Sequence, residues 1–144
     1  MKIVVQRSGE SRVLVDEQCV GEISKGMVLL ICCEVGDDLN TAKKASEKLL
    51  KLRIFEDEQG RMNRDIIQSE GQILAISQFT LSWDGKKGNR PSFDGSMEPA
   101  KANELFLKIC EFLSEKVRVE TGKFGASMRV EITNQGPVTF SLSF

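Results

Sequence analysis

Residues 26–33 form a continuous apolar run with the sequence GMVLLICC. A run of this length without a polar residue is typical of a strand that is buried on both faces. Two more apolar segments predict strands at 2–6 and 73–76, and the second leads into Ser77-Gln78-Phe79-Thr80-Leu81. The sequence predicts about seven strands in all, the others lying at 13–15, 20–23, 128–134 and 138–144.

Two segments instead have the 3.6-residue periodicity of amphipathic helices. The first covers residues 39–53, and Asp38 before it is a predicted N-cap. The second begins near residues 96–99, where Pro99 suits a first turn. The two apolar faces comprise Leu39, Ala42, Ala45, Leu49 and Leu52, and Ala102, Leu105, Phe106, Ile109, Phe112 and Leu113.

These elements predict a mixed α/β fold in a single domain over residues 1–144. The expected architecture is a small barrel-like mixed β-sheet with two packed helices. A chain of 144 residues is long enough to bury a core without a metal or a disulfide.

The charge balance limits the classes of partner. Lys and Arg number 20 against 21 Asp and Glu, so the net charge is -1. This argues against a strong, sequence-independent hold on long nucleic acid such as DNA, although contact with a few phosphates stays open. No run approaches the 18 apolar residues of a membrane span, and the chain begins as a strand without room for a signal peptide. We therefore expect a cytoplasmic protein with no membrane partner.

The sequence contains no His and no Tyr. A Ser-His-Asp triad, a Cys-His dyad and a His-ligated metal site are therefore excluded within the chain. Any catalysis must come from carboxylates, Lys, Arg, hydroxyls, thiols, the backbone or the substrate. The four cysteines, Cys19, Cys32, Cys33 and Cys110, form no C-x-x-C pair, so we interpret them as small hydrophobic residues and expect no metal and no cofactor.

Three segments have both a functional and a structural interpretation. Ser77-Gln78-Phe79-Thr80-Leu81 lies where a buried strand meets a glycine-rich loop, so its free amides can bind an oxyanion or can simply end a strand. Asn134-Gln135-Gly136-Pro137 has the composition of a turn between two strands. The basic loop 86–90 can touch phosphate, but its composition favours a solvated surface loop.

Together, Ser77-Gln78-Phe79-Thr80-Leu81 and Asn134-Gln135-Gly136-Pro137-Val138-Thr139 resemble the paired signatures of the D-aminoacyl-tRNA deacylases. The resemblance extends over nearly all 144 residues. Further blocks that match in order are Gln6-Arg7, Arg53-Ile54-Phe55, Met62-Asn63, Arg90-Pro91-Ser92-Phe93 and Thr121-Gly122-Lys123-Phe124-Gly125-Ala126-Ser127-Met128.

The resemblance implies hydrolysis of the ester bond of D-aminoacyl-tRNA, and of glycyl-tRNA, as chiral proofreading in translation quality control. It implies that the Phe79 and Thr80 amides stabilise the oxyanion, while the substrate's 2′-hydroxyl assists cleavage. Ser77 and Gln78 would shape the adenosine end of the tRNA. The pocket would be lined by Phe124 and Met128.

The resemblance also implies a homodimer in which a cis Gly136-Pro137 peptide of one subunit enters the partner's site. We call this pair the gate. Its main-chain carbonyls would hold the α-amino group of a D-residue and leave no room for an L side chain. Arg7 and Asn134 would support it.

Two departures from the family pattern concern this gate. Residues 8–12 differ from the apolar and small residues expected there, and Gln135 stands where Asp is common. Retention of Ser77 and Gln78 favours the strictly D-specific type. Two rival functions remain open: a non-catalytic module that binds tRNA ends, and a thiol-dependent hydrolase that uses Cys19 or Cys110.

Overall fold

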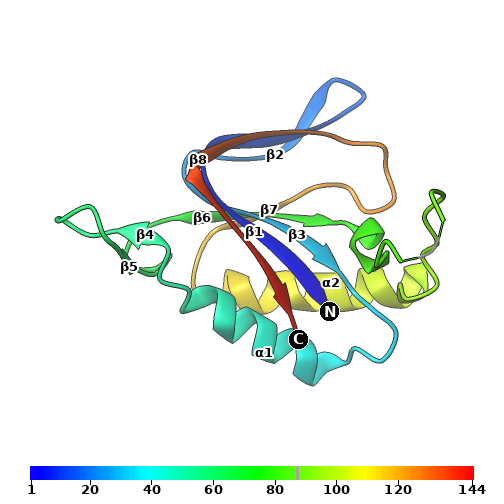
Figure 1. Cartoon of the computed structure of the whole chain (residues 1–144). Helices are drawn as coiled ribbons and strands as arrows, with labels where there is room; N and C mark the ends of the chain where they lie inside the picture. The colour runs from blue at the N-terminus through cyan, green and yellow to red at the C-terminus, as the bar shows by residue number, and fades with distance from the viewer. Residues whose placement is uncertain (87) are drawn as a thin grey trace.

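Strand β3 (Gly26–Cys32), which contains most of the apolar run, lies inside a mixed sheet in the computed structural model of the chain (Figure 1). The structure describes residues 1–86 and 88–144. Strand β3 pairs antiparallel with β1 (Lys2–Val15) and parallel with β6 (Gln72–Ser77). Six of its seven residues are buried, as expected for a strand covered on both faces.

The other strands extend this centre to both sides. Strand β7 (Val119–Thr121) pairs parallel with β6, and β2 (Gln18–Ile23) pairs antiparallel with the second half of β1. Strand β8 (Arg129–Ser143) pairs antiparallel with β1 over almost its whole length. The short strands β4 (Phe55–Glu56) and β5 (Met62–Arg64) form a separate hairpin.

The main sheet curls until its two ends nearly meet. Strand β2 approaches β7 so closely that a Cβ added at Gly21 would lie 2.5 Å from the main-chain oxygen of Thr121. Only glycine allows the two backbones this approach. The predicted fold class is therefore confirmed: a barrel-like mixed sheet with two helices.

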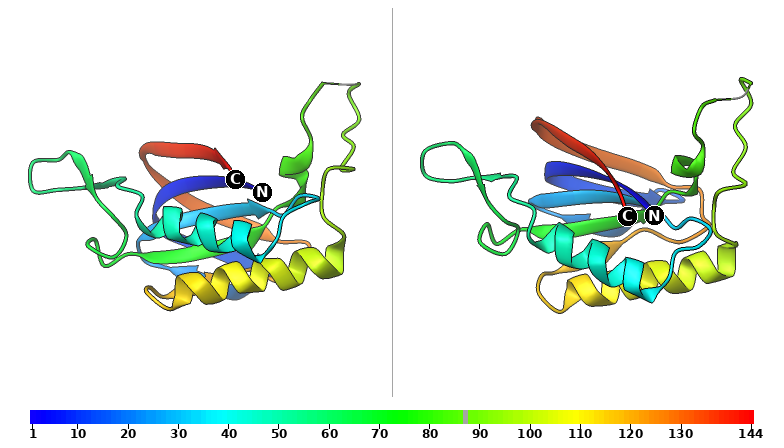
Figure 2. Two further views of the ribbon diagram at one scale, coloured as in Figure 1. Left: turned by 90° about the horizontal axis from the view of Figure 1, so that it is seen from below. Right: turned by 60° about the horizontal axis from the view of Figure 1, so that its bottom comes forward.

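Both helices cover one face of the sheet, as Figure 2 shows. They are α1 (Leu39–Leu50) and α2 (Pro99–Ser114). Their apolar faces join a core that includes Ile3, Leu29, Ile73, Leu49 and Ile109. A second, smaller cluster fills the inside of the curled sheet and comprises Val13, Ile23, Val28, Leu74 and Ile76. Among the described residues, no helix is both long and apolar enough to cross a membrane.

Side chains mark the start of each helix. The Asp38 carboxylate accepts a hydrogen bond from the Thr41 amide at 2.8 Å, and the capping box is complete. The backbone hydrogen bond from Thr41 lowers the pKa of Asp38. Glu98 directly precedes Pro99, the first residue of α2. Its carboxylate accepts hydrogen bonds from the amides of Ala100 and Lys101.

Three local predictions were wrong. The first helix ends at Leu50 rather than residue 53, because the Leu52 amide turns back to the carbonyl of Leu49. Residues 79–82 form a short 3₁₀ helix, η1 (Phe79–Ser82), where only the end of a strand and the start of a loop were expected. The two predicted strands 128–134 and 138–144 are one strand, β8, since both halves pair with β1.

Candidate active site

A cavity of about 600 Å³ opens at the end of β6, between η1, the start of α2 and the segment before β8. Its volume is within the usual range for small-molecule sites. Five of the predicted substrate-site residues line it together, although they come from two distant parts of the sequence. They are Ser77, Gln78, Phe79, Phe124 and Met128.

Two main-chain amides are available beside this cavity. The Gln78 amide donates to the carbonyl of Ile31 at 2.7 Å and so anchors η1 to the end of β3. The first turn of a helix leaves its leading N–H groups unused. Accordingly, the amides of Phe79 and Thr80 have no acceptor within the described part of the chain. They are free to donate to an external oxygen.

Neighbouring side chains hold η1 in place. The Gln78 amide group donates to the Thr80 hydroxyl at 2.5 Å. From the other side, the Cys32 thiol donates to the carbonyl of Phe79 at 3.5 Å. The Phe79 ring meets the Phe93 ring edge-on, with their centroids 4.9 Å apart. These contacts orient the two free amides before any substrate arrives.

We expect the Thr80→Ala variant to keep most of its activity. Thr80 does not line the cavity, and its hydroxyl already accepts a hydrogen bond from Gln78. The change removes one neutral hydrogen bond and leaves the main-chain amide, so kcat/KM should fall by no more than about tenfold. Single-turnover hydrolysis measures this, with thermal unfolding as the control for folding. A loss of about 10⁴-fold in a folded variant would make the hydroxyl a nucleophile.

The far wall of the cavity comes from the segment between β7 and β8. The Phe124 ring packs against Phe106 of α2 at 6.4 Å between centroids. Met128 folds back so closely that a Cβ at Gly122 would lie 2.6 Å from its sulfur. Phe93 also lines the cavity, and sequence reasoning gave it no role. In the sequence, only its position in the block Arg90-Pro91-Ser92-Phe93 pointed to a role for Phe93. The neighbouring residues do not show that this loop folds back onto η1.

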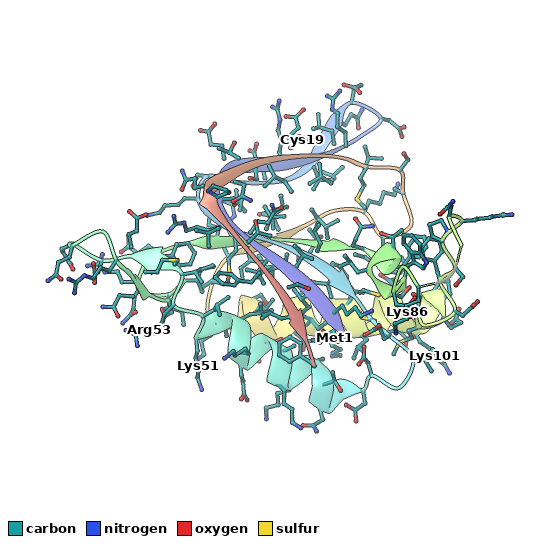
Figure 3. All side chains as sticks on the ribbon, viewed as in Figure 1. Met1, Cys19, Lys51, Arg53, Lys86 and Lys101 are labelled. Atoms are coloured by element: carbon teal, nitrogen blue, oxygen red, sulfur yellow. The ribbon has the colours of Figure 1, made fainter. Side chains whose placement is uncertain are left out.

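The cysteines do not form a nucleophilic site. Cys19 is exposed on β2, as labelled in Figure 3, and neither it nor Cys110 lines the cavity. Burial raises the pKa of Cys110 to about 12. Cys33 does line the cavity, but burial raises its pKa to about 12 as well. A thiol with such a pKa carries almost no thiolate near neutral pH.

Alkylation of the native protein with iodoacetamide at neutral pH should therefore label Cys19 alone and leave hydrolysis unchanged. The thiolate is the reactive form, and burial suppresses it at Cys33 and Cys110. Peptide mass spectrometry locates the label, and unfolded protein, labelled at all four cysteines, is the positive control. Modification of Cys110 that proceeds in step with loss of activity would restore the thiol mechanism.

The gate lies on a loop that β8 makes while it stays paired with β1. Gln6 pairs with Thr139 and Ser8 with Asn134, so residues 135–138 stand opposite Arg7 alone. We call residues 135–138 the gate loop. The Gly136–Pro137 peptide bond is cis, and Gly136 has a φ of +123°. The pairing on both sides forces these residues out of the sheet.

Both predicted support residues contact the gate loop. Asn134 accepts from the Val138 amide at 3.1 Å and donates to the Thr139 hydroxyl at 2.8 Å, which closes the loop at its base. Arg7, only 9% exposed, donates to the carbonyl of Gln135 at 3.2 Å. The Gln135 side chain instead lies over Gly9, where an added Cβ would be 2.9 Å from its nitrogen.

Within one chain, the gate and the cavity lie at opposite ends of the sheet. Through the strand register, Ser77 is level with Ile31 and Ile3, whereas Arg7 is level with Met27. Four residues along β1 correspond to about 13 Å. Accordingly, β8 bends at one end of the sheet in Figure 1, and η1 lies at the other end. Of the predicted site residues, Thr80, Arg7, Asn134, Gly136 and Pro137 do not line the cavity.

The family model described as D-Tyr-tRNA(Tyr) deacylase matches residues 4–143. The chain belongs to this family. Among its curated relatives, the D-aminoacyl-tRNA deacylase of Lactobacillus gasseri is 46% identical over 143 residues and 99% of both chains. The D-aminoacyl-tRNA deacylase of Persephonella marina is 49% identical over 140 residues, which are 97% of this chain and 95% of the relative.

Two solved structures share the fold of this chain. A structure titled c-Myc DNA Unwinding Element Binding Protein superposes with a TM-score of 0.95 at 35% identity and covers 100% of this chain and 99% of its own. A second, titled as a probable eukaryotic D-amino acid tRNA deacylase, superposes with a TM-score of 0.81 at 16% identity, covering 98% and 97%. At that identity the second structure shows a shared fold alone.

Proposed function

We propose that the protein is a single-domain hydrolase that cleaves the ester bond of D-aminoacyl-tRNA, and of glycyl-tRNA, to release the amino acid and tRNA. The observation that carries this proposal is a pair of amides, those of Phe79 and Thr80, that have no acceptor among the described residues and lie beside a cavity of about 600 Å³. The deacylase names of relatives that match almost the whole chain support the choice of substrate.

The chemistry needs no imidazole. Water adds to the ester carbonyl carbon, and the carbonyl oxygen becomes an oxyanion that accepts from the amides of Phe79 and Thr80. The intermediate then breaks the bond to the ribose 3′ oxygen, which takes the proton that water loses. The neighbouring 2′-hydroxyl carries this proton. Because an aminoacyl ester is already activated, positioning and two preorganised donors suffice.

We infer that the working form is a homodimer in which each gate enters the partner's cavity. In a single subunit the gate and the cavity lie at opposite ends of the sheet, so neither end contains both parts of the substrate site. A twofold pair makes two complete sites from the same surfaces. One edge of the 15-residue strand β8 has no strand partner among the described residues and lies beside the gate loop.

The gate explains how one site selects by chirality. The Gln135 carbonyl is occupied by Arg7, whereas Gly136 and Pro137 have no partner on β1 in the described pairing. Their carbonyls are available for the α-amino group of the substrate. An L side chain would then point into the gate backbone, while a D side chain or the hydrogen of glycine points away.

The direct test compares D-Tyr-tRNA, L-Tyr-tRNA and Gly-tRNA as substrates, with a chelator present throughout. We expect release of D-tyrosine and glycine, retention of the L ester, and a dimer mass in solution. Tight binding without turnover would instead favour a non-catalytic module that binds tRNA ends. Activity that returns only when one metal is added back would overturn the metal-free mechanism.

A further inference from the structure

The Arg7 guanidinium has three partners that come from two other segments of the chain. It donates from Nε to the carbonyl of Gln135 at 3.2 Å and from Nη1 to the carbonyl of Ile54 at 2.9 Å. Its third partner is the Glu56 carboxylate, 3.2 Å from Nη2. Two of the partners are neutral carbonyls, so Glu56 provides the only opposite charge among these contacts. A buried cation depends strongly on such a counter-charge.

The nitrogen that contacts Glu56 also faces the gate. A Cβ added at Gly136 would lie 3.0 Å from Nη2 of Arg7. One nitrogen is therefore close both to the carboxylate of Glu56 and to the position that a side chain at Gly136 would take. Because the guanidinium is planar and rigid, its three acceptors together set its tilt and hence the distance from Nη2 to the gate, and Glu56 is the only charged one of the three.

Glu56 belongs to a braced hairpin. It lies in β4, which pairs with β5, and the Asp57 carboxylate accepts from the amides of Gln59 at 2.9 Å and Arg61 at 3.0 Å in the turn. Arg53, labelled in Figure 3, donates to the carbonyl of Asn63 at 2.7 Å. The carboxylate of Glu56 is thus presented to Arg7 by an ordered element.

We propose that Glu56 is a positioning residue that sets the geometry of the gate through Arg7. The β4–β5 hairpin then contributes to the discrimination between D- and L-aminoacyl esters, although it does not touch the substrate. This inference rests on the proposed function of the gate. Without the carboxylate, the guanidinium loses one of its three acceptors and can tilt, so Nη2 no longer keeps a fixed position against Gly136 and the gate loop is held less rigidly.

The test uses Glu56→Gln, with Glu58→Gln as the matched control. Glu58 lies in the same hairpin but pairs with Arg64, so the control removes the same charge without touching Arg7. Because the Glu56 side chain is 58% exposed while Arg7 is buried, solvent weakens the pair, and we expect Glu56→Gln to lower the ratio of kcat/KM for D-Tyr-tRNA over L-Tyr-tRNA by about fivefold. Glu58→Gln should leave this ratio unchanged.

A double-mutant cycle shows whether Glu56 acts through Arg7. In an Arg7→Gln background, Glu56→Gln should have no additional effect on the D/L ratio. Glu56→Asp, which keeps the charge, should recover part of the loss. Additive effects of the two changes would overturn the route through Arg7.

Amide hydrogen exchange at Val138 tests the same idea without any substrate. Val138 belongs to the gate loop, and its amide donates to the side chain of Asn134 at the base of the loop, so the amide of a looser loop exchanges faster. We expect faster exchange in Glu56→Gln than in Glu58→Gln. Equal exchange and equal D/L ratios in the two variants would overturn the proposal. A wild-type protein that fails to cleave D-Tyr-tRNA would refute the proposed function, while the exchange measurement would still decide the role of Glu56.

Discussion

The Gly136→Ala variant is expected to lose D-aminoacyl-tRNA hydrolysis by about a hundredfold, because small displacements of positioning groups have effects of this size. Gly136 has a φ of +123°, which residues with a side chain rarely adopt. A Cβ there would lie 2.7 Å from Cγ2 of Val138 and 3.0 Å from Nη2 of Arg7. The loop must therefore shift against both neighbours.

The expected damage is local, so the dimer should persist. Residues on both sides of the gate loop stay paired with β1, and their pairing does not depend on Gly136. We would measure kcat/KM on matched D- and L-Tyr-tRNA, together with the dimer mass. Activity should fall, or discrimination should relax, in a protein that is still dimeric.

Gly36→Ala is the matched control for this experiment. Gly36 also has a positive φ, +94°, but a Cβ there would meet nothing within 4 Å. It therefore reproduces the backbone strain without the clash at the gate. If Gly136→Ala keeps the wild-type rate and D/L ratio, Gly136-Pro137 is only a turn, and the gate proposal fails.

The Gly26→Ala variant should lose about 4 kcal/mol or more in free energy of unfolding, at the upper end for single substitutions. Gly26 begins β3 at a φ of +144°, and a Cβ there would lie 1.8 Å from the oxygen and 2.5 Å from the nitrogen of Gln72. Both are main-chain atoms at the start of β6, so no change of side-chain rotamer relieves the contact. The two central parallel strands must separate where they begin.

Urea denaturation with linear extrapolation measures the effect. Gly60→Ala is the comparison, since Gly60 has a φ of +73° and open space around it, and its strain should cost only about 1–2 kcal/mol. A Gly26→Ala variant that cannot be obtained as soluble protein would agree with the prediction, because so large a loss of stability leaves much of the chain unfolded. A stability within about 1 kcal/mol of the Gly60→Ala variant would show that β3 and β6 adjust easily at this point.

Local patterns predicted the elements whose signals lie within a few neighbouring residues. Most of the run at 26–33 became β3, because an uninterrupted apolar run of this length is typical of a covered strand. Asp38 was predicted as an N-cap, and the structure confirms it, because capping involves residues only three positions apart. Composition alone excluded every mechanism that needs an imidazole, since the chain has no His.

The sequence did not reveal features that depend on distant pairing. Residues 134–137 were interpreted as a turn between two strands, but pairing with β1 on both sides makes residues 135–138 a loop within one strand. Likewise, Phe93 joins the cavity because its loop folds back onto η1, a contact between residues 14 positions apart. Such contacts depend on which segments the whole sheet brings together.

The sequence by itself therefore determined the kinds of element, the family and the list of candidate residues. Only the tertiary structure showed that the candidate residues form two separate groups. Ser77, Gln78 and Phe79 lie at one end of the sheet, and Arg7 and Gly136 lie at the other. Secondary structure follows from backbone and side-chain preferences within a few residues. Position in a curled sheet follows instead from strand register, because each pairing fixes the level of one strand against another.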